Sequence, residues 1–184
     1  MAALMITLIA CALAATGGRW WQIAAVAARH GIAGQASILA GVALVALAAG
    51  WLGQTTHEEV AGRGMMLFLA IALLLAGGSA LWPVRPLHPK LEASVQGPVS
   101  GFVIALAALI SDSGPFIILA AAAWTGEWML AAAGGAAGLA AAAVAAFMLT
   151  ANSMSGWITG ARRTAGALFL IVGAVTALAA LGLL

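Results

Sequence analysis

The sequence predicts an all-α integral membrane protein with six transmembrane helices, arranged as two inverted three-helix repeats in which the first helix of each repeat is broken. Composition is the first observation behind this prediction: 65% of the 184 residues are hydrophobic, 7% are charged, and the mean hydropathy is +1.14. Seven basic and five acidic residues are too few to cover a globule in water. The lipid bilayer is therefore the expected surrounding of the chain.

The second observation is the length of the apolar stretches, because a helix of about 20 apolar residues crosses the bilayer core. Six stretches of this kind follow one another along the chain. They comprise residues 2–28, 33–53, 65–82, 99–124, 129–151 and 164–184. None alternates polar and apolar residues with period two, so helices are expected and barrel strands are excluded.

Polar interruptions in the first and fourth stretches are the third observation. "ATGGRWWQ" at 15–22 and "SDSGP" at 111–115 place polar and helix-breaking residues inside otherwise apolar runs. Proline lacks a backbone donor and kinks a helix, and glycine permits backbone geometry that other residues resist. The residues of these two kinds are Gly17, Gly18, Gly114 and Pro115. Both stretches are therefore predicted to be broken helices.

The start of the first stretch has two interpretations. An apolar core followed by the small residues Ala12 to Ala14 is typical of a removable signal peptide. However, no Lys or Arg precedes this core, and the hydrophobic character resumes after Arg19 and continues to Ala28. We therefore expect a retained first span.

Two glycines in the fifth stretch predict close packing. Gly134 and Gly138 are four residues apart and share one face of a helix, which lets a neighbouring helix approach closely. The pattern predicts tight helix packing, with a homodimer as one outcome.

Basic residues predict the orientation of the chain, because cytoplasmic loops carry an excess of Lys and Arg. Three loops share one side, and their basic residues are Arg29, Arg85, Lys90, Arg162 and Arg163. The opposite side has Arg63 alone. This asymmetry predicts a multi-pass protein of the cell inner membrane with both termini outside the cytoplasm.

The chain divides into two halves with the same order of features. Residues 1–82 and 99–184 each contain a broken helix, a helix rich in small residues and a Leu-rich helix, and residues 83–98 form a cytoplasmic linker. An odd number of spans per half inverts the second half relative to the first. This is the plan of secondary transporters, whose broken helices meet near the midplane and hold the substrate.

This layout resembles the Gdt-one family, the Golgi manganese/calcium transporters and their bacterial manganese-exporter relatives in the lysine-exporter superfamily. The resemblance covers essentially the whole chain, with local similarity in "AVAARHG" (25–31), "LAGVALVAL" (39–47) and "GALFLIVGAVTAL" (166–178). It implies a six-helix, two-repeat fold and exchange of a cation such as manganese or calcium for protons.

In that family each repeat carries Glu-x-Gly-Asp, then a basic residue and Thr or Ser, and the acidic residues are thought to bind the cation. In the first repeat of this chain the Glu and Asp positions hold Ala15 and Gly18, while Gly17 and the basic Arg19 match. In the second repeat they hold Leu109 and Asp112. One carboxylate of four is present, and a divalent cation prefers several hard oxygen ligands.

Asp112 and Arg19 occupy corresponding positions, so the inverted repeat brings both toward the midplane. One hypothesis pairs them, because pairing removes much of the roughly 2.5–3.5 kcal/mol that each charge costs at a helix centre. The other hypothesis makes Asp112 the metal-binding or proton-carrying carboxylate of a transporter. Neighbouring polar residues that could bind the substrate, or bond freed backbone groups, are Thr16, Gln22, Ser111 and Ser113.

Two functions remain after the sequence is compared with known motifs. The first is a Gdt-one-type secondary transporter, exchanging manganese, calcium or a related small solute for protons by antiport at Asp112. The second is a degenerate, non-transporting structural or regulatory subunit with an Arg19–Asp112 pair. The sequence contains no enzyme signature and no cofactor motif, and a net charge of +2 is too small to indicate a nucleic-acid partner.

Overall fold

The computed structural model describes residues 1–60, 62–95, 98–149 and 156–183, which form nine α-helices and no strand. The first predicted span is α1 (Ala2–Ala15) followed by α2 (Arg19–Ala28), and the fourth is α6 (Pro98–Ile110) followed by α7 (Ser113–Thr125). The axes of α1 and α2 differ by 82°, and those of α6 and α7 by 58°. Both predicted helix breaks are therefore confirmed.

The unbroken helices are α3 (Ile32–Glu59), α4 (Arg63–Leu81), α8 (Trp128–Met148) and α9 (Gly156–Ala180). Each of these four helices is long and apolar enough to cross a membrane. If each bent pair forms one further span, the number of candidate spans rises to six. Four to six candidate spans fit a multi-pass membrane protein. Residues 150 and 151, at the predicted end of the fifth span, lie outside the described residues.

The start of α9 corrects one predicted boundary. The sequence placed the sixth span at 164–184, but the helix begins at Gly156 and includes Arg162 and Arg163. Arginine has a high helix propensity, and these two residues lie near the end of the bundle, where a long side chain can reach polar surroundings. The linker also differs, because it contains the short helix α5 (Pro89–Ser94).

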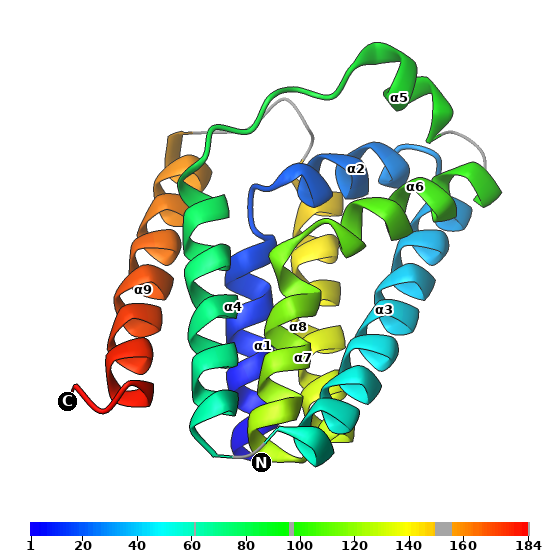
Figure 1. Ribbon diagram of the computed structural model, residues 1–184. Coiled ribbons are helices and arrows are strands. Elements are labelled where there is room, and N and C mark those ends of the chain that lie inside the picture. Colours follow the sequence, from blue (N-terminus) through cyan, green and yellow to red (C-terminus); the bar gives the residue numbers. More distant parts are fainter. Residues whose placement is uncertain (61, 96–97, 150–155, 184) are drawn as a thin grey trace.

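Figure 1 shows how the helices are arranged. The helices α1, α3, α4, α7, α8 and α9 run alongside one another, whereas α2 and α6 lie across the end of the bundle that carries α5. Both chain termini lie at the opposite end. We call these the α5 end and the terminal end.

Small residues bring the helices close together. A Cβ atom on Gly134 or Gly138 would clash with backbone atoms of α1, at Leu4 and Leu8. Close approach at these glycines is therefore confirmed, and the neighbouring helix is α1 of the same chain. This face is covered, so it does not provide the surface for the homodimer that the sequence suggested.

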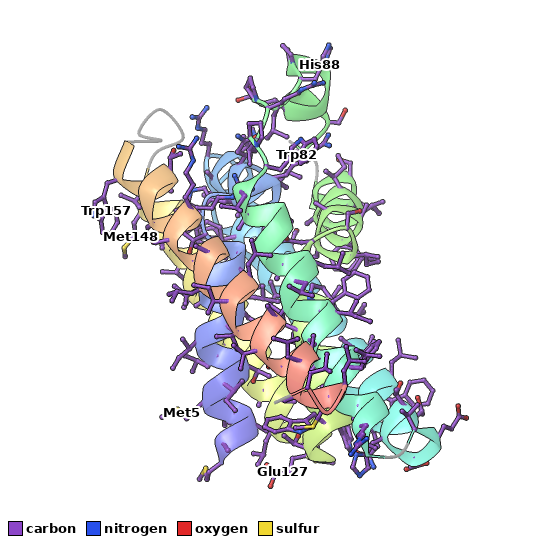
Figure 2. All side chains as sticks on the ribbon, turned by 60° about the vertical axis from the view of Figure 1, so that its left-hand side comes forward. Met5, Trp82, His88, Glu127, Met148 and Trp157 are labelled. Carbon is purple, nitrogen blue, oxygen red and sulfur yellow. The ribbon has the colours of Figure 1, made fainter. Side chains whose placement is uncertain are left out.

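Large hydrophobic side chains cover the outward faces of the bundle, as expected for a lipid-facing surface. On α9, for example, Leu168, Ile171 and Val175 are exposed. Side chains with nitrogen and oxygen gather toward the two ends in Figure 2, with His88 and Trp82 at the α5 end and Glu127 at the terminal end. This distribution matches a chain with an apolar belt and two polar ends.

Candidate functional site

The first helix break is built by Thr16, Gly17 and Gly18. The Thr16 hydroxyl donates to the carbonyl oxygen of Ala12 at 2.7 Å and so bonds within its own helix. Gly17 has φ +69°, a conformation that favours glycine, and a Cβ there would come within 3.0 Å of Ile158. Gly18 has an extended backbone and caps α2. Of the glycines predicted at the breaks, only Gly17 needs unusual backbone geometry.

The second break is built by Ser111 and Asp112. Ser111 donates its hydroxyl proton to the carbonyl oxygen of Ala107 at 2.8 Å. Asp112 caps α7, because its Oδ1 accepts a hydrogen bond of 2.8 Å from the backbone N–H of Ser113. Pro115 lies in the first turn of α7. Backbone N–H groups in this turn have no partner within the helix, so the proline removes no helical hydrogen bond. Gly114 lets α7 approach Leu139 of α8.

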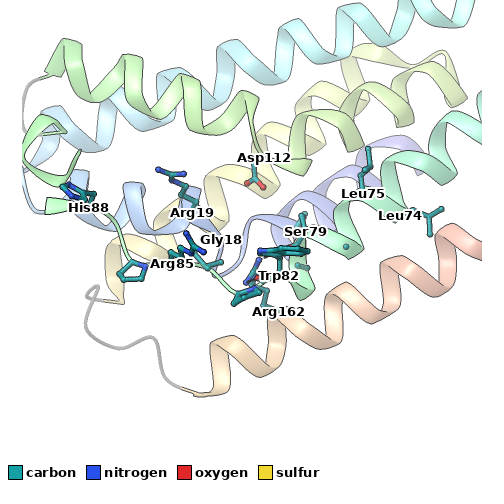
Figure 3. A pocket seen from close by; sticks show the side chains of 16 residues that line it. Gly18, Arg19, Leu74, Leu75, Ser79, Trp82, Arg85, His88, Asp112 and Arg162 are labelled. Atoms are coloured by element: carbon teal, nitrogen blue, oxygen red, sulfur yellow. Dashed lines mark hydrogen bonds between the residues drawn. The ribbon is translucent and has the colours of Figure 1, made fainter. Parts of the chain in front are cut away.

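A cavity of about 780 Å³ lies beside both breaks at the α5 end. The break residues Gly18 and Asp112, the second half of α4, the linker and Arg162 of α9 surround it, as Figure 3 shows. On α4 the cavity reaches Leu74, near the middle of the helix. It therefore extends from the linker well into the bundle.

A second cavity of about 310 Å³ lies between α2 and α6 and shares Arg19 and Asp112 with the first. Trp20 and Ser111 also line it. Two buried polar atoms at this junction, Nε1 of Trp20 and Oδ2 of Asp112, have no hydrogen-bond partner among the described residues. A buried donor or acceptor without a partner is costly, so this donor and this acceptor indicate a place for a bound polar group.

Three guanidinium groups and one carboxylate give the larger cavity its charge. The guanidinium groups belong to Arg19, Arg85 and Arg162, and His88 also lines the cavity. Arg162 donates from Nη2 to the carbonyl oxygen of Ser79 at 2.6 Å and from Nη1 to that of Trp82 at 2.9 Å. Its charge also acts on Asp112.

The ion pair between Arg19 and Asp112, one of the two hypotheses from the sequence, is not formed. The structure gives no salt bridge between the two side chains, and Figure 3 shows the Arg19 guanidinium pointing away from Asp112. The reason lies in α2, where Trp20 and Trp21 are buried in the core and leave Arg19 on the exposed side. The basic residue that acts on Asp112 is instead Arg162.

Of the other predicted site residues, one lines a cavity and three do not. Ser111 lines the smaller cavity, whereas Thr16, Gln22 and Ser113 line neither cavity. Thr16 serves the backbone of α1, and the Ser113 N–H bonds Asp112.

The sequence pattern did not indicate that Arg85, His88 and Arg162 line a cavity. Arg85 and Arg162 belong to the basic segments that predict the orientation of the chain. For Arg162 a signal existed in the apolar residues Trp157 and Ile158, which precede the arginines and continue the helical stretch upstream. For Arg85 and His88 no local pattern indicates that the linker lines a cavity.

The two cavities offer a divalent cation one carboxylate, that of Asp112. No group of three or more His, Cys, Asp and Glu residues that could hold a metal ion occurs among the described residues. Asp112 has three arginines around the same cavity, and manganese and calcium favour several oxygen ligands. The role of Asp112 as a metal ligand therefore stays a prediction of the family resemblance.

Comparisons of the chain with models of protein families, with curated proteins and with solved structures find no match.

Proposed function

We propose that this protein is a secondary transporter that moves a small solute through the cavity beside Asp112. One observation carries this proposal: a cavity bounded by two helix breaks extends into a membrane protein and meets a carboxylate whose buried Oδ2 has no hydrogen-bond partner in the described part of the chain. Charged residues inside membrane proteins are costly and typically mark substrate or proton pathways. Asp112 is the group that takes up a proton or a polar group of the solute.

The arrangement of the helices supports a transporter of the two-repeat type that the resemblance to the Gdt-one family implies. Under the repeat, α1 corresponds to α6, α2 to α7, α3 to α8 and α4 to α9. The pairs α1–α8 and α6–α3 pack against each other, as do the pairs α2–α8 and α7–α3. These contacts match in pairs, which supports the two-repeat arrangement that we propose.

One difference between the halves concerns access to the site. In the first half α1 runs along the bundle and α2 lies across its end, whereas in the second half α6 lies across the end and α7 runs along the bundle. Both breaks therefore face the α5 end. A conformation open to this end is one of the states that alternating access requires.

The alternative of a non-transporting subunit depended on an Arg19–Asp112 pair that fixes helix packing. This pair is absent, and both residues line the cavities instead. Two polar breaks beside a cavity of this volume favour a role in moving a solute over a purely structural one.

Reconstitution into liposomes tests the proposal. Liposomes would contain a metal-sensitive dye or a pH-sensitive dye, and manganese, calcium, sulfate, phosphate or malonate would be added outside under an imposed pH gradient. We expect solute-dependent proton movement that Asp112→Asn abolishes and Glu59→Gln leaves unchanged, because Glu59 is exposed at the end of α3. Folded protein that moves neither protons nor any of these solutes would contradict the proposal.

A further inference from the structure

The charge of the larger cavity indicates which class of solute it takes. Three of the seven basic residues of the chain, Arg19, Arg85 and Arg162, line this one cavity together with the single carboxylate of Asp112. Arg19 and Arg85 are exposed, and Arg162 is half-buried. These three come from three separate segments and surround one hollow (Figure 3).

The three guanidinium groups differ in what they already bind. Arg162 uses two donors on the carbonyl oxygens of Ser79 and Trp82. The guanidinium groups of Arg19 and Arg85 have no hydrogen bond or ion pair with the described residues. Against the single carboxylate of Asp112, the three guanidinium groups leave the cavity with two positive charges that have no counter-charge among its lining residues.

Guanidinium groups have a specific ligand chemistry. Their planar set of donors matches the oxygens of carboxylate, phosphate and sulfate groups, to which they bind in a bidentate manner. A cation would meet two uncompensated positive charges, whereas an oxyanion would neutralise them. The volume of about 780 Å³ is in the range of small-molecule sites.

Arg85 and Arg19 reach the larger cavity from two different segments of the chain. Arg85 belongs to the linker at the α5 end, and Arg19 begins α2 at the helix break beside the second cavity. An anion that enters from the α5 end would meet both guanidinium groups in the same cavity. Asp112 lines both cavities as well.

We propose that the cavity is an oxyanion site, in which Arg19 and Arg85 bind a carboxylate, phosphate or sulfate group. Transport of this anion rests on the proposed function, whereas its binding in the cavity does not. The same chemistry occurs in a free solute and in the phosphate of an anionic lipid headgroup, so the experiment needs to separate the two sources.

Labelling of arginines with phenylglyoxal tests this proposal on the unmodified protein. The protein would be placed in phosphatidylcholine nanodiscs, and mass spectrometry would follow the labelling rate of each arginine in sulfate, phosphate or malonate, against chloride at equal ionic strength. Arg63 is the internal control, because it is exposed at the terminal end and lines neither cavity.

We expect at least one of these anions to slow labelling of Arg19 and Arg85 by about threefold, which corresponds to a concentration about twice the dissociation constant, while the rate at Arg63 is unchanged. A second arm adds phosphatidylglycerol without a free anion. Protection in that arm alone identifies a lipid phosphate as the occupant, whereas protection by the free anions identifies a solute.

The variant Asp112→Asn distinguishes an anion site from a cation site. Removal of the carboxylate charge lowers the anion concentration needed for half-maximal protection, because it removes a repulsion. Equal labelling rates at Arg19 and Arg85 with and without all three anions, in both lipid compositions, would overturn the proposal. Anion protection without solute movement in liposomes would contradict transport alone, and solute movement without protection would contradict the oxyanion site alone.

Discussion

Arg162 of α9 donates a hydrogen bond of 2.9 Å from Nη1 to the carbonyl oxygen of Trp82, the residue that follows α4. The last carbonyl groups of a helix have no partner within it, and a cation there also interacts favourably with the helix dipole. Arg162 therefore joins α4 to α9 and, at the same time, holds the start of the linker that lines the cavity.

Loss of this contact is expected to destabilise the protein. Replacement Arg162→Gln removes both hydrogen bonds to α4, and charge-assisted bonds of this kind contribute about 1–2 kcal/mol together when they are half-exposed. Unfolding in mixed detergent micelles would measure the change in the free energy of unfolding. Arg163→Gln is the matched control, because the neighbouring Arg163 is exposed and its guanidinium group has no hydrogen bond to the described residues. Equal stability of the two variants would contradict this role.

The contact between α1 and α8 gives a second prediction. A Cβ at Gly134 would clash with the Leu4 carbonyl oxygen and the buried Thr7 hydroxyl, so Gly134→Ala is expected to cost about 2 kcal/mol of unfolding free energy. The control is Gly160→Ala in α9, where a Cβ has open space and the change raises helix propensity by up to about 1 kcal/mol. The same micelle titration serves both variants, and a neutral Gly134→Ala would show that α1 moves freely on α8.

Apolar length and polar interruption suffice to predict most of the helices, because both properties are local. Both breaks lie where polar residues interrupt apolar stretches, at residues 16–18 and 111–112. The direction of the chain after each break cannot be predicted from local sequence in the same way, because it depends on which face of the next helix packs into the core. Burial of Trp20 and Trp21 decides that direction for α2, and it turns Arg19 away from Asp112.

The basic lining of the cavity could not be predicted for the same reason. Arg85 and Arg162 are 77 positions apart in the numbering, and only the packing of α4 against α9 brings the linker beside the start of α9. The excess of basic residues in these segments is also typical of cytoplasmic loops. An excess of basic residues is therefore the same in the sequence whether these residues only face the cytoplasm or also line a cavity.

Orientation in the membrane is testable with introduced cysteines, because the chain has a single cysteine, Cys11, and it is buried. We expect Glu59→Cys at the terminal end to react with a membrane-impermeant methanethiosulfonate in intact cells. Pro89→Cys at the α5 end should react only after permeabilisation, because the basic segments predict that this end lies in the cytoplasm. The opposite pattern would contradict the predicted orientation, and the native chain reports any background from Cys11.

Access to Asp112 through the larger cavity gives the last prediction. Gly78 of α4 lines this cavity, and a Cβ there meets no atom within 4 Å. Gly78→Phe should therefore fill part of the cavity without a clash and slow the reaction of Asp112 with a water-soluble carbodiimide several-fold, since the reagent needs a path to a buried carboxylate.

Gly160→Phe is the control for this change, because Gly160 also has open space around its Cβ but lines neither cavity. Mass spectrometry would compare labelling of Asp112 with that of Glu127, an exposed carboxylate at the terminal end. The ratio should fall for Gly78→Phe and stay constant for Gly160→Phe. If Gly78→Phe leaves the ratio unchanged while the protein remains folded, the reagent reaches Asp112 by another route, such as the cavity between α2 and α6, and the larger cavity is not the path to the carboxylate.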